Sequence, residues 1–473
     1  MLYKSLNNHF ILFFSLYITI SSYVEEGNIY LPMVSNFTLQ HSQKKINNKN
    51  YYTIPLQVGT PAVEFKVQVD TSTSTSWIPS KRCKNCVLAE TFYEEEDSKT
   101  SSPTNSIIKL EDEDGNVEGY EISDNIQLGK YKLKQYGFVQ VIKVADNFRD
   151  HYEGKLGLGY TSRLDNKEFN FLEHLKKNNL ISKKIFSINS INEKKGMLFI
   201  GDLPGKEYNT FCNITTDTNN IDDMYKESWI CQISHVGVFN LDKGIFNKLK
   251  YYDELQNNNL VNFDSAYDFI AVPMAEKDKI DKLLEKAELE CTTSKKSENE
   301  KLKDETLRNR IREEEITITC KTDFEELRTK NIALSFILQG YAYSIPLDLL
   351  FVQGIKSGEM EMLIKIIDDE EAIWTFGYPF MNQYLMIFNM EDNNVGIKKL
   401  KKTALPIISL SKEWEKWNVK GENYYIFKII AFIVLILIVL VIIFLIYRAI
   451  RKRSLDSNGP AFDIGNNNKD IVY

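Results

Sequence analysis

The chain has 473 residues, of which 43% are hydrophobic and 26% are charged. This balance is typical of a folded globular protein and excludes a largely disordered chain. The formal net charge of −7, and the lack of a Lys/Arg block paired with aromatic residues in the body of the chain, argue against a nucleic-acid partner.

An apolar run, Phe10–Ile20, lies near the N-terminus, after Lys4 and before small serine residues. A positive charge, an apolar run and small residues in this order predict a secretory signal peptide over residues 1–22. An uncleaved anchor is the alternative, but the run is short for a bilayer. Residues 23–50 then form a short N-terminal segment.

From residue 51 to about residue 400 the sequence consists mostly of short runs in which apolar and polar residues alternate, separated by Gly, Asn and Asp. This pattern predicts a large, mainly β domain. The clearest helical pattern is Glu168–Asn178. No repeat of 20–50 residues is present, which excludes a solenoid or a propeller.

Two aspartates each follow a strand-like run and enter a turn of small residues. Asp70 follows the run ending at Val69 and precedes Thr71, while Asp264 follows Leu260–Phe263 and precedes Ser265. Either motif alone is typical of an ordinary turn. Together they predict a pair of catalytic carboxyls.

The chemistry of peptide hydrolysis explains why two carboxyls are needed. Without a metal or a nucleophile, a water molecule is held between them, one ionised to take the proton of the water and the other protonated to polarise the carbonyl. Close carboxyls push their pKa values apart and so separate these roles. The hydroxyls of Thr71 and Ser265 can brace the two turns. Other hydrolase motifs, HExxH and GxSxG, are absent from the sequence.

Six cysteines lie between the two terminal apolar segments. In a secretory lumen such cysteines form disulfides more often than metal sites. No second CxxC and no nearby histidine supports a zinc or redox site at Cys83 and Cys86. Six cysteines allow fifteen connectivities. We predict the pairs that join sequence neighbours: Cys83–Cys86, Cys212–Cys231 and Cys291–Cys320.

Residues 276–315 are rich in Lys and Glu. Such charge runs are usually solvated surfaces, so we expect a charged insertion that forms a solvated helical hairpin or a flexible loop. A partner-binding insertion is the alternative.

A second apolar segment occupies residues 426–447, and its only charge is Lys428. Its length matches the hydrocarbon thickness of a bilayer, and it has no polar face. Several arginines and lysines follow directly, which predicts a cytosolic tail over residues 448–473. Residues 401–425 form a spacer. We therefore expect a single-pass type I membrane protein of the secretory pathway, with a lumenal or extracellular domain.

The whole set of motifs resembles the pepsin-like aspartic proteases, and among them the plasmepsins. The matching pieces occur in the order of that family: Ile54–Pro61, Asp70 with Trp77–Ser80, Gly119–Gly129, Glu153–Tyr160, Gly196–Gly201, Asp264, Phe376–Phe380 and Asn394–Ile397.

The resemblance implies a bilobal, mainly β fold with an N-lobe at about 51–205, a C-lobe at about 206–400 and a cleft between them. A β-hairpin flap would cover the cleft. It also implies an endopeptidase that needs no metal and no cofactor and acts on peptide or protein substrates. The layout of signal, catalytic domain, single span and short tail is similar to that of the memapsins. We expect a monomer.

The sequence departs from the family around both aspartates. Ser72 and Ala266 replace the usual glycines. Thr73 can still hydrogen-bond the outer oxygen of Asp70, but Tyr267 cannot place its hydroxyl in the equivalent way beside Asp264. Lys155 replaces an apolar residue that normally packs beneath the first aspartate, where a buried lysine would favour the ionised carboxylate.

The flap and the N-terminal segment also depart from the family. The tyrosine expected at the flap tip falls near Asp112, although Asp114 and Gly115 make a good hairpin turn. The segment before residue 51 is short for an inhibitory prosegment. The leading hypothesis is an active aspartic endopeptidase. The alternative is a catalytically weak or inactive pseudoprotease that binds peptides or proteins, while a purely structural protein leaves the paired motifs unexplained.

Overall fold

The computed structural model describes most of the predicted catalytic domain. It describes residues 29–35, 52–86, 89–110, 116–129, 131–145, 153–161, 169–192, 195–201, 210–215, 225–251, 259–295, 315–354, 356–369, 372–399, 405, 407–409 and 444. The predicted signal peptide, flap tip and cytosolic tail, and nearly all of the predicted span, lie outside these residues. Within them, no helix is both long enough and apolar enough to cross a bilayer.

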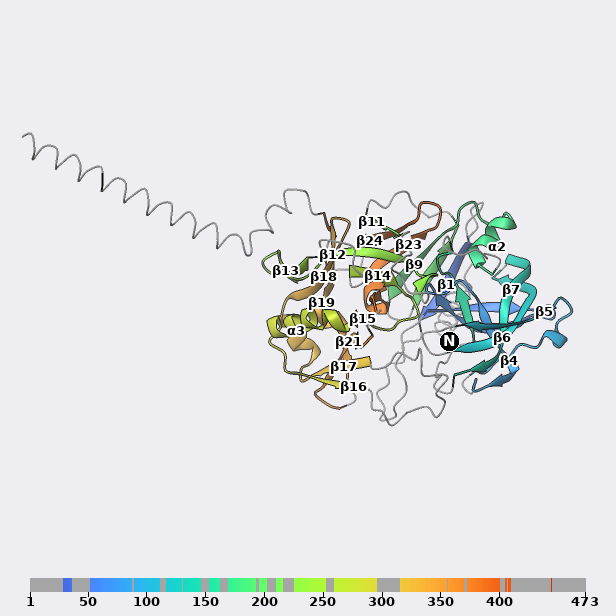
Figure 1. The fold of residues 1–473 in the computed structure, drawn as a ribbon, viewed down its shortest axis with the longest axis horizontal. Coiled ribbons are helices and arrows are strands. Elements are labelled where there is room, and N and C mark those ends of the chain that lie inside the picture. Colours follow the sequence, from blue (N-terminus) through green and yellow to red (C-terminus); the bar gives the residue numbers. More distant parts are fainter. Residues whose placement is uncertain are drawn as a thin grey trace, which may run out of the picture. The chain divides into compact units, whose positions relative to one another are not determined.

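The described residues are mainly β, as predicted, and their strands form two sheets. In Figure 1 the blue to teal strands β4–β7 lie together, and the yellow to orange strands β16, β17 and β21 form a separate group. The first sheet has 13 strands: β1 (Ile29–Ser35), β2 (Tyr52–Val58), β3 (Val63–Asp70), β4 (Trp77–Lys84), β5 (Ser102–Leu110), β6 (Val117–Leu128), β7 (Tyr131–Val144), β8 (Lys155–Gly157), β9 (Ile185–Asn192), β10 (Lys195–Ile200), β11 (Phe211–Asn213), β23 (Tyr384–Asn389) and β24 (Asn394–Lys399).

The first sheet does not follow the lobe boundary expected near residue 205. Strand β23, from the far end of the domain, pairs with β9, and β24 and β11 continue the sheet beyond it. Strand β1, which belongs to the expected N-terminal segment, pairs with both β10 and β2. The sheet therefore joins three parts of the chain that the sequence pattern treats as separate.

The hairpin expected for the flap is present. Strands β5 and β6 pair in antiparallel register, with Leu110 opposite Val117 at the last described pair. The turn predicted at Asp114 and Gly115 lies outside the described residues.

In the part of the chain that the structure describes, the second sheet has 12 strands. They are β12 (Ile230–Asn240), β13 (Ile245–Tyr251), β14 (Leu260–Phe263), β15 (Ile270–Pro273), β16 (Cys291–Lys295), β17 (Glu315–Cys320), β18 (Ile332–Leu338), β19 (Tyr341–Pro346), β20 (Phe351–Gln353), β21 (Met360–Ile367), β22 (Trp374–Phe376) and β25 (Ile408–Ser409). Short β14 and β22 run parallel and place Phe263 opposite Phe376, beside the second aspartate.

Among the described residues, four α-helices accompany the sheets: α2 (Phe171–Lys177), α3 (Lys277–Lys286), α4 (Phe324–Thr329) and α5 (Tyr378–Met381). Helix α2 lies inside the predicted helical range. The side chain of Asn170 caps it by accepting a hydrogen bond from the backbone N–H of Glu173.

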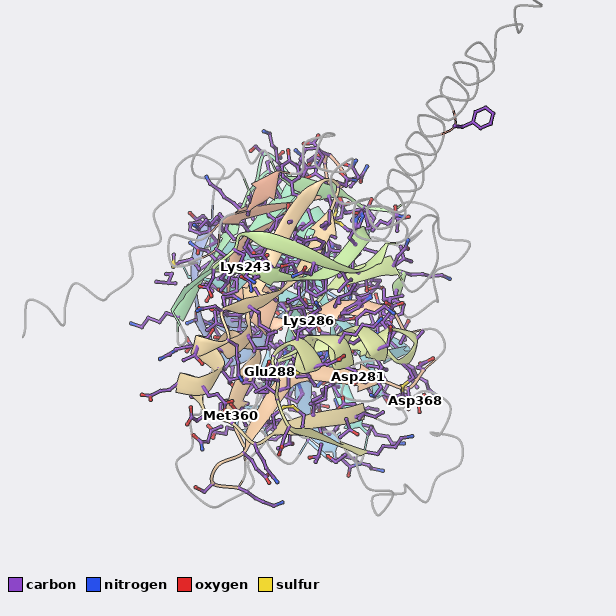
Figure 2. The ribbon with its side chains drawn as sticks, turned by 90° about the vertical axis from the view of Figure 1, so that its left-hand side faces the viewer. Lys243, Asp281, Lys286, Glu288, Met360 and Asp368 are labelled. Atoms are coloured by element: carbon purple, nitrogen blue, oxygen red, sulfur yellow. A yellow bond between two sulfur atoms is a disulfide. The ribbon has the colours of Figure 1, made fainter. Side chains whose placement is uncertain are left out.

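Helix α3 corrects the expectation of a wholly solvated insertion at residues 276–315. Ile280, Leu283 and Leu284 recur at helical spacing and are buried, so one face of the helix belongs to the core. Figure 2 shows Asp281 and Lys286 on the exposed side. Residues 287–290 connect α3 to β16, and Glu315 begins β17. Residues 296–314 lie outside the described residues.

Aromatic side chains join the two sheets in one core. Trp229, just before β12, contacts the rings of Phe186 in β9 and Phe388 in β23, which stack on each other at 4.6 Å. Trp229 is fully buried. The segment that leads into the second sheet is thus anchored in the core of the first.

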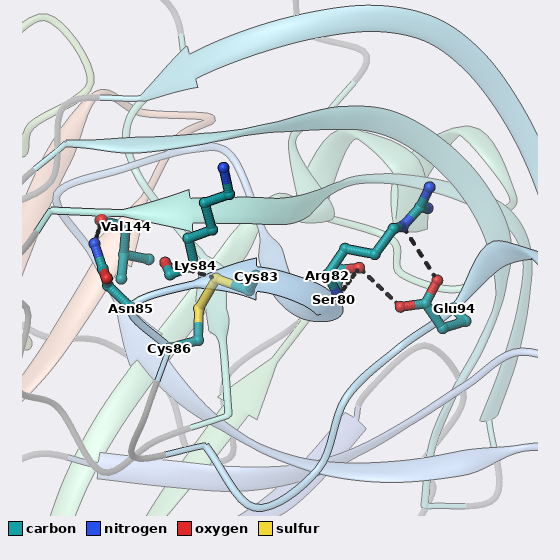
Figure 3. Close-up of a disulfide and its surroundings, with 8 residues drawn as sticks. All are labelled: Ser80, Arg82, Cys83, Lys84, Asn85, Cys86, Glu94 and Val144. Carbon is teal, nitrogen blue, oxygen red and sulfur yellow. Dashed lines mark hydrogen bonds and ion pairs between the residues drawn. A yellow bond between two sulfur atoms is a disulfide. The ribbon is translucent and has the colours of Figure 1, made fainter.

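The three disulfides confirm the predicted pairing. They are Cys83–Cys86, Cys212–Cys231 and Cys291–Cys320. Figure 3 shows the first of these in a tight loop, where the side-chain amide of Asn85 donates to the carbonyl of Val144. The third closes the base of the β16–β17 hairpin, where its two cysteines lie opposite each other.

Removing the Cys291–Cys320 bridge by a double serine substitution is expected to lower the free energy of unfolding by about 3–4 kcal/mol, because it closes a long loop and restricts the unfolded chain. The matched control is the double serine variant at Cys83 and Cys86, whose sequence separation is 3 against 29. The control is expected to lose only about 2 kcal/mol. Denaturant unfolding measures both, and equal losses would contradict the loop-closure explanation.

Candidate active site

Strand β3 carries Asp70 at its end, with alternate residues Phe65, Val67 and Val69 buried in the core. Its parallel neighbour β8 places Gly157 opposite Asp70 and Lys155 opposite Gln68. Side chains two residues apart on a strand share a face. The register therefore puts the long side chain of Lys155 on the same face as the carboxyl of Asp70.

Gly157 is required by the close approach of the aspartate turn. A Cβ atom at this position would lie 2.6 Å from the backbone carbonyl carbon of Ser74, well inside contact distance. The absence of a side chain lets the turn after Asp70 fold back over β8.

Both oxygens of the Asp70 carboxylate accept hydrogen bonds. The backbone N–H and the hydroxyl of Ser72 each donate to Oδ1 at 2.7 Å, and the ammonium of Lys155 donates to Oδ2 at 2.9 Å. The side chains of Asp70 and Lys155 are 0% exposed. The expected placement of Lys155 against the first aspartate is therefore confirmed, and the two form a buried ion pair.

Asp264 follows β14 in the second sheet. Its backbone N–H donates to the carbonyl of Phe376 at 3.1 Å, and its Oδ1 accepts from the backbone N–H of Ala266 at 2.9 Å. Gly377 allows this arrangement, because a Cβ atom there would lie 2.4 Å from the carbonyl oxygen of Tyr267. Asp264 as a whole is buried, with 2% of its surface exposed.

Hydrogen bonds of Thr71 and Ser265 join the two aspartate turns. The N–H of Thr71 donates to the hydroxyl of Ser265 at 3.1 Å, and the N–H of Ser265 donates to the hydroxyl of Thr71 at 3.0 Å. Each hydroxyl also donates to a backbone carbonyl of the opposite strand: Thr71 to Phe263 and Ser265 to Val69, at 2.8 and 2.7 Å. These four bonds hold Asp70 and Asp264 in neighbouring turns.

Substituting Thr71 by valine is expected to lower the free energy of unfolding by about 1–3 kcal/mol, because valine keeps the shape but leaves the buried N–H of Ser265 and carbonyl of Phe263 without this partner. Thr104→Val is the control, since its exposed hydroxyl donates to the carbonyl of Glu121 at 3.1 Å. Denaturant unfolding compares them. Equal stabilities for the two variants would show that the hydrogen bonds of the Thr71 hydroxyl do not stabilise the fold.

One of the predicted supporting residues, Thr73, has another hydrogen-bond partner than expected. The hydroxyl of Thr73 donates to Oε2 of Glu227 at 3.4 Å instead of to Asp70, whose outer oxygen bonds Lys155. The expectation that Thr73 hydrogen-bonds Asp70 is thus wrong. Tyr267 is buried beside the second aspartate, with its ring 5.0 Å from that of Phe269.

Sequence reasoning missed two polar groups at this site. It treated Ser72 only as an enlarged glycine, although a hydroxyl two residues after an aspartate commonly bonds back to it. It also missed Glu227, whose half-buried carboxylate accepts the backbone N–H of Ser74. No local pattern marks Glu227, because its partner lies 153 residues earlier in the chain.

A small cluster next to Asp264 combines aromatic and charged groups. Tyr267 and Phe269 pack with Ile367 of β21, and the ammonium of Lys365 lies 4.0 Å from the centre of the Phe269 ring. Burial raises the pKa of Glu361 on the same strand, against the opposing charge of Lys365. Among the described residues, no group of three or more His, Cys, Asp or Glu side chains is arranged to hold a metal ion.

Comparison with known proteins points in the same direction as the geometry. The profile of the family described as eukaryotic aspartyl protease matches residues 51–400. The chain is similar to pregnancy-associated glycoprotein 1 of Sus scrofa, with 32% identity over 32% of this chain and 40% of that protein. It is also similar to renin of Echis ocellatus, with 26% identity over 35% and 42%, and to vacuolar protease A of Arthroderma otae, with 30% identity over 30% and 36%. The chain thus spans about two fifths of these relatives.

Proposed function

Because the chain belongs to the eukaryotic aspartyl protease family, we propose that it is an aspartic endopeptidase that hydrolyses peptide bonds with Asp70 and Asp264. The observation that carries the proposal is the reciprocal hydrogen bonding of Thr71 and Ser265, which joins the turns of the two aspartates. We expect the two carboxyls to lie within hydrogen-bonding reach of one water molecule.

The proposed reaction balances one proton between the pair. Asp70, ionised and paired with Lys155, takes a proton from the water as its oxygen bonds to the carbonyl carbon of the substrate. Asp264, protonated, gives its proton to the carbonyl oxygen. In the second half, Asp70 passes its proton to the leaving amine and Asp264 recovers one from the hydroxyl, so that the C–N bond breaks and both carboxyls return to their first state.

The ion pair also supports the second candidate function, a pseudoprotease that binds a peptide without cleaving it. When Asp70 takes a proton, the buried Lys155 loses its counter-charge, and an uncompensated buried charge is costly. Proton transfer to Asp70 must therefore separate a buried ion pair, which adds to the cost of the step. The binding module remains the alternative for that reason.

We also propose a location. The apolar run near the N-terminus and the apolar residues 426–447 with the basic residues that follow support a secretory, single-pass type I membrane protein, similar in layout to membrane-anchored members of the family. Three disulfides suit an oxidising compartment. Plasmepsin-like character and a monomeric state belong to the same proposal.

The test is peptidase activity of the purified full chain on a broad peptide library, from acid to neutral pH. Cleavage that a statine-containing peptide inhibits, and that Asp264→Asn abolishes, would establish the endopeptidase. Binding of the inhibitor without cleavage at any pH would favour the pseudoprotease. Neither cleavage nor binding would contradict both.

A further inference from the structure

A third carboxylate, that of Glu227, lies behind the turn of Asp70. Glu227 belongs to the segment between the two sheets, just before β12. Its Oε2 accepts the backbone N–H of Ser74 and the hydroxyl of Thr73, and its backbone carbonyl accepts the N–H of Tyr160 at 2.6 Å. The residue therefore contacts both the loop after Asp70 and the chain that follows β8.

The packing around these bonds leaves little room for movement. The N–H of Gly159 donates to the carbonyl of Thr73 at 2.7 Å, and a Cβ atom on Gly159 would lie 2.6 Å from the carbonyl carbon of Thr73 and 2.7 Å from the carbonyl oxygen of Glu227. Only a glycine permits this approach. The backbone of the loop after Asp70 and that of the segment between the two sheets are thus in direct contact.

The same segment also contacts the strand of the second aspartate. Two residues after Glu227, the buried Trp229 accepts the N–H of Phe263 at its carbonyl, at 3.2 Å. The indole N–H of Trp229 donates to the carbonyl of Leu158 at 3.0 Å. Three consecutive residues, 227–229, therefore link the loop after Asp70 to the residue that precedes Asp264.

We propose that Glu227 is a positioning residue of the active site, which clamps the loop after Asp70 and holds Thr73 away from the aspartate. With Thr73 bonded to Glu227, Oδ2 of Asp70 is the acceptor for Lys155. Glu227 acts through this loop and does not touch the reacting atoms. The inference rests on the proposed peptidase function only for its kinetic test.

The kinetic test compares Glu227→Ala and Glu227→Gln in the full chain. Alanine is expected to lower kcat by about 10–100-fold with KM unchanged, because the loop that follows the base Asp70 is then misplaced. Glutamine keeps an acceptor for Ser74 and is expected to restore most of the rate. The matched control is Glu391→Ala, whose carboxylate accepts the backbone N–H of Lys184 at 2.9 Å outside both aspartate turns. Unchanged kcat in Glu227→Ala overturns the proposal.

A stability test needs no activity. If Glu227 sets the place of Asp70 relative to Lys155, the Tm changes of Glu227→Ala and Lys155→Met should fail to add by more than about 2 °C, since coupled sites are non-additive. Additive changes overturn the positioning role. A parent chain that cleaves nothing refutes the proposed function. The comparison of the Tm changes of the two single variants and the double variant then decides the inference alone. Should alanine prevent folding, Glu227→Asp, whose shorter side chain withdraws the carboxylate from Ser74, replaces it in both tests.

Discussion

Asp264→Asn is expected to lower the peptidase kcat/KM of the full chain by about 10²–10⁴-fold, because asparagine cannot give the proton that polarises the substrate carbonyl. The fold should survive the change. The amide oxygen of asparagine can still accept the backbone N–H of Ala266, which bonds Oδ1 at 2.9 Å. Peptide cleavage and denaturant unfolding, measured on one preparation, separate the two effects.

The control is Asp281→Asn on helix α3, which removes an exposed carboxylate paired with Lys277 at 2.7 Å. This variant should keep the activity of the parent. Its free energy of unfolding should change by no more than about 1 kcal/mol. Asp70→Asn is expected to lose activity as fully as Asp264→Asn but to unfold more easily, because it leaves Lys155 buried without a counter-charge. An Asp264→Asn enzyme that keeps the rate of the parent would show that the pair is assigned wrongly.

Features that depend on a local pattern could be predicted from the sequence. Alternating apolar residues indicated the β architecture, and each aspartate turn stood out by its small hydroxyl neighbours. The bracing of the two turns by Thr71 and Ser265 could be predicted as well, since two short hydroxyl side chains in facing turns have few other partners. The three disulfides joined sequence neighbours, which the β layout favoured. Lys155 could be placed because the resemblance to the pepsin-like aspartic proteases implies that this position packs beneath Asp70.

Features that depend on distant contacts could not. The pairing of β23 with β9 carries the first sheet across the expected lobe boundary. No local sequence pattern predicts this pairing. The same holds for Glu227, which redirects Thr73 across 154 residues. Helix α3 is a different case. Its buried Ile280, Leu283 and Leu284 were visible at helical spacing, but the density of charge around them led to the expectation of a solvated insertion.

Lys155→Met is expected to lower the free energy of unfolding at neutral pH by about 3–5 kcal/mol, because it leaves a buried carboxylate without its partner. The double variant Lys155→Met/Asp70→Asn should recover most of the stability, since no buried charge remains. Denaturant unfolding of the parent and the two variants measures the loss and the recovery.

The same substitution has the opposite expected effect on turnover. Without Lys155, the water proton can pass to Asp70 without separating a buried ion pair, so kcat should rise while KM changes little. Lys184→Met is the control, because its pairing with Glu173 at 2.9 Å is partly exposed and should contribute about 1 kcal/mol or less. If Lys155→Met is as stable as this control at neutral pH, the ion pair is not a buried structural element. If it is destabilised but cleaves no faster than the parent at any pH, the ion pair with Lys155 does not limit proton transfer to Asp70.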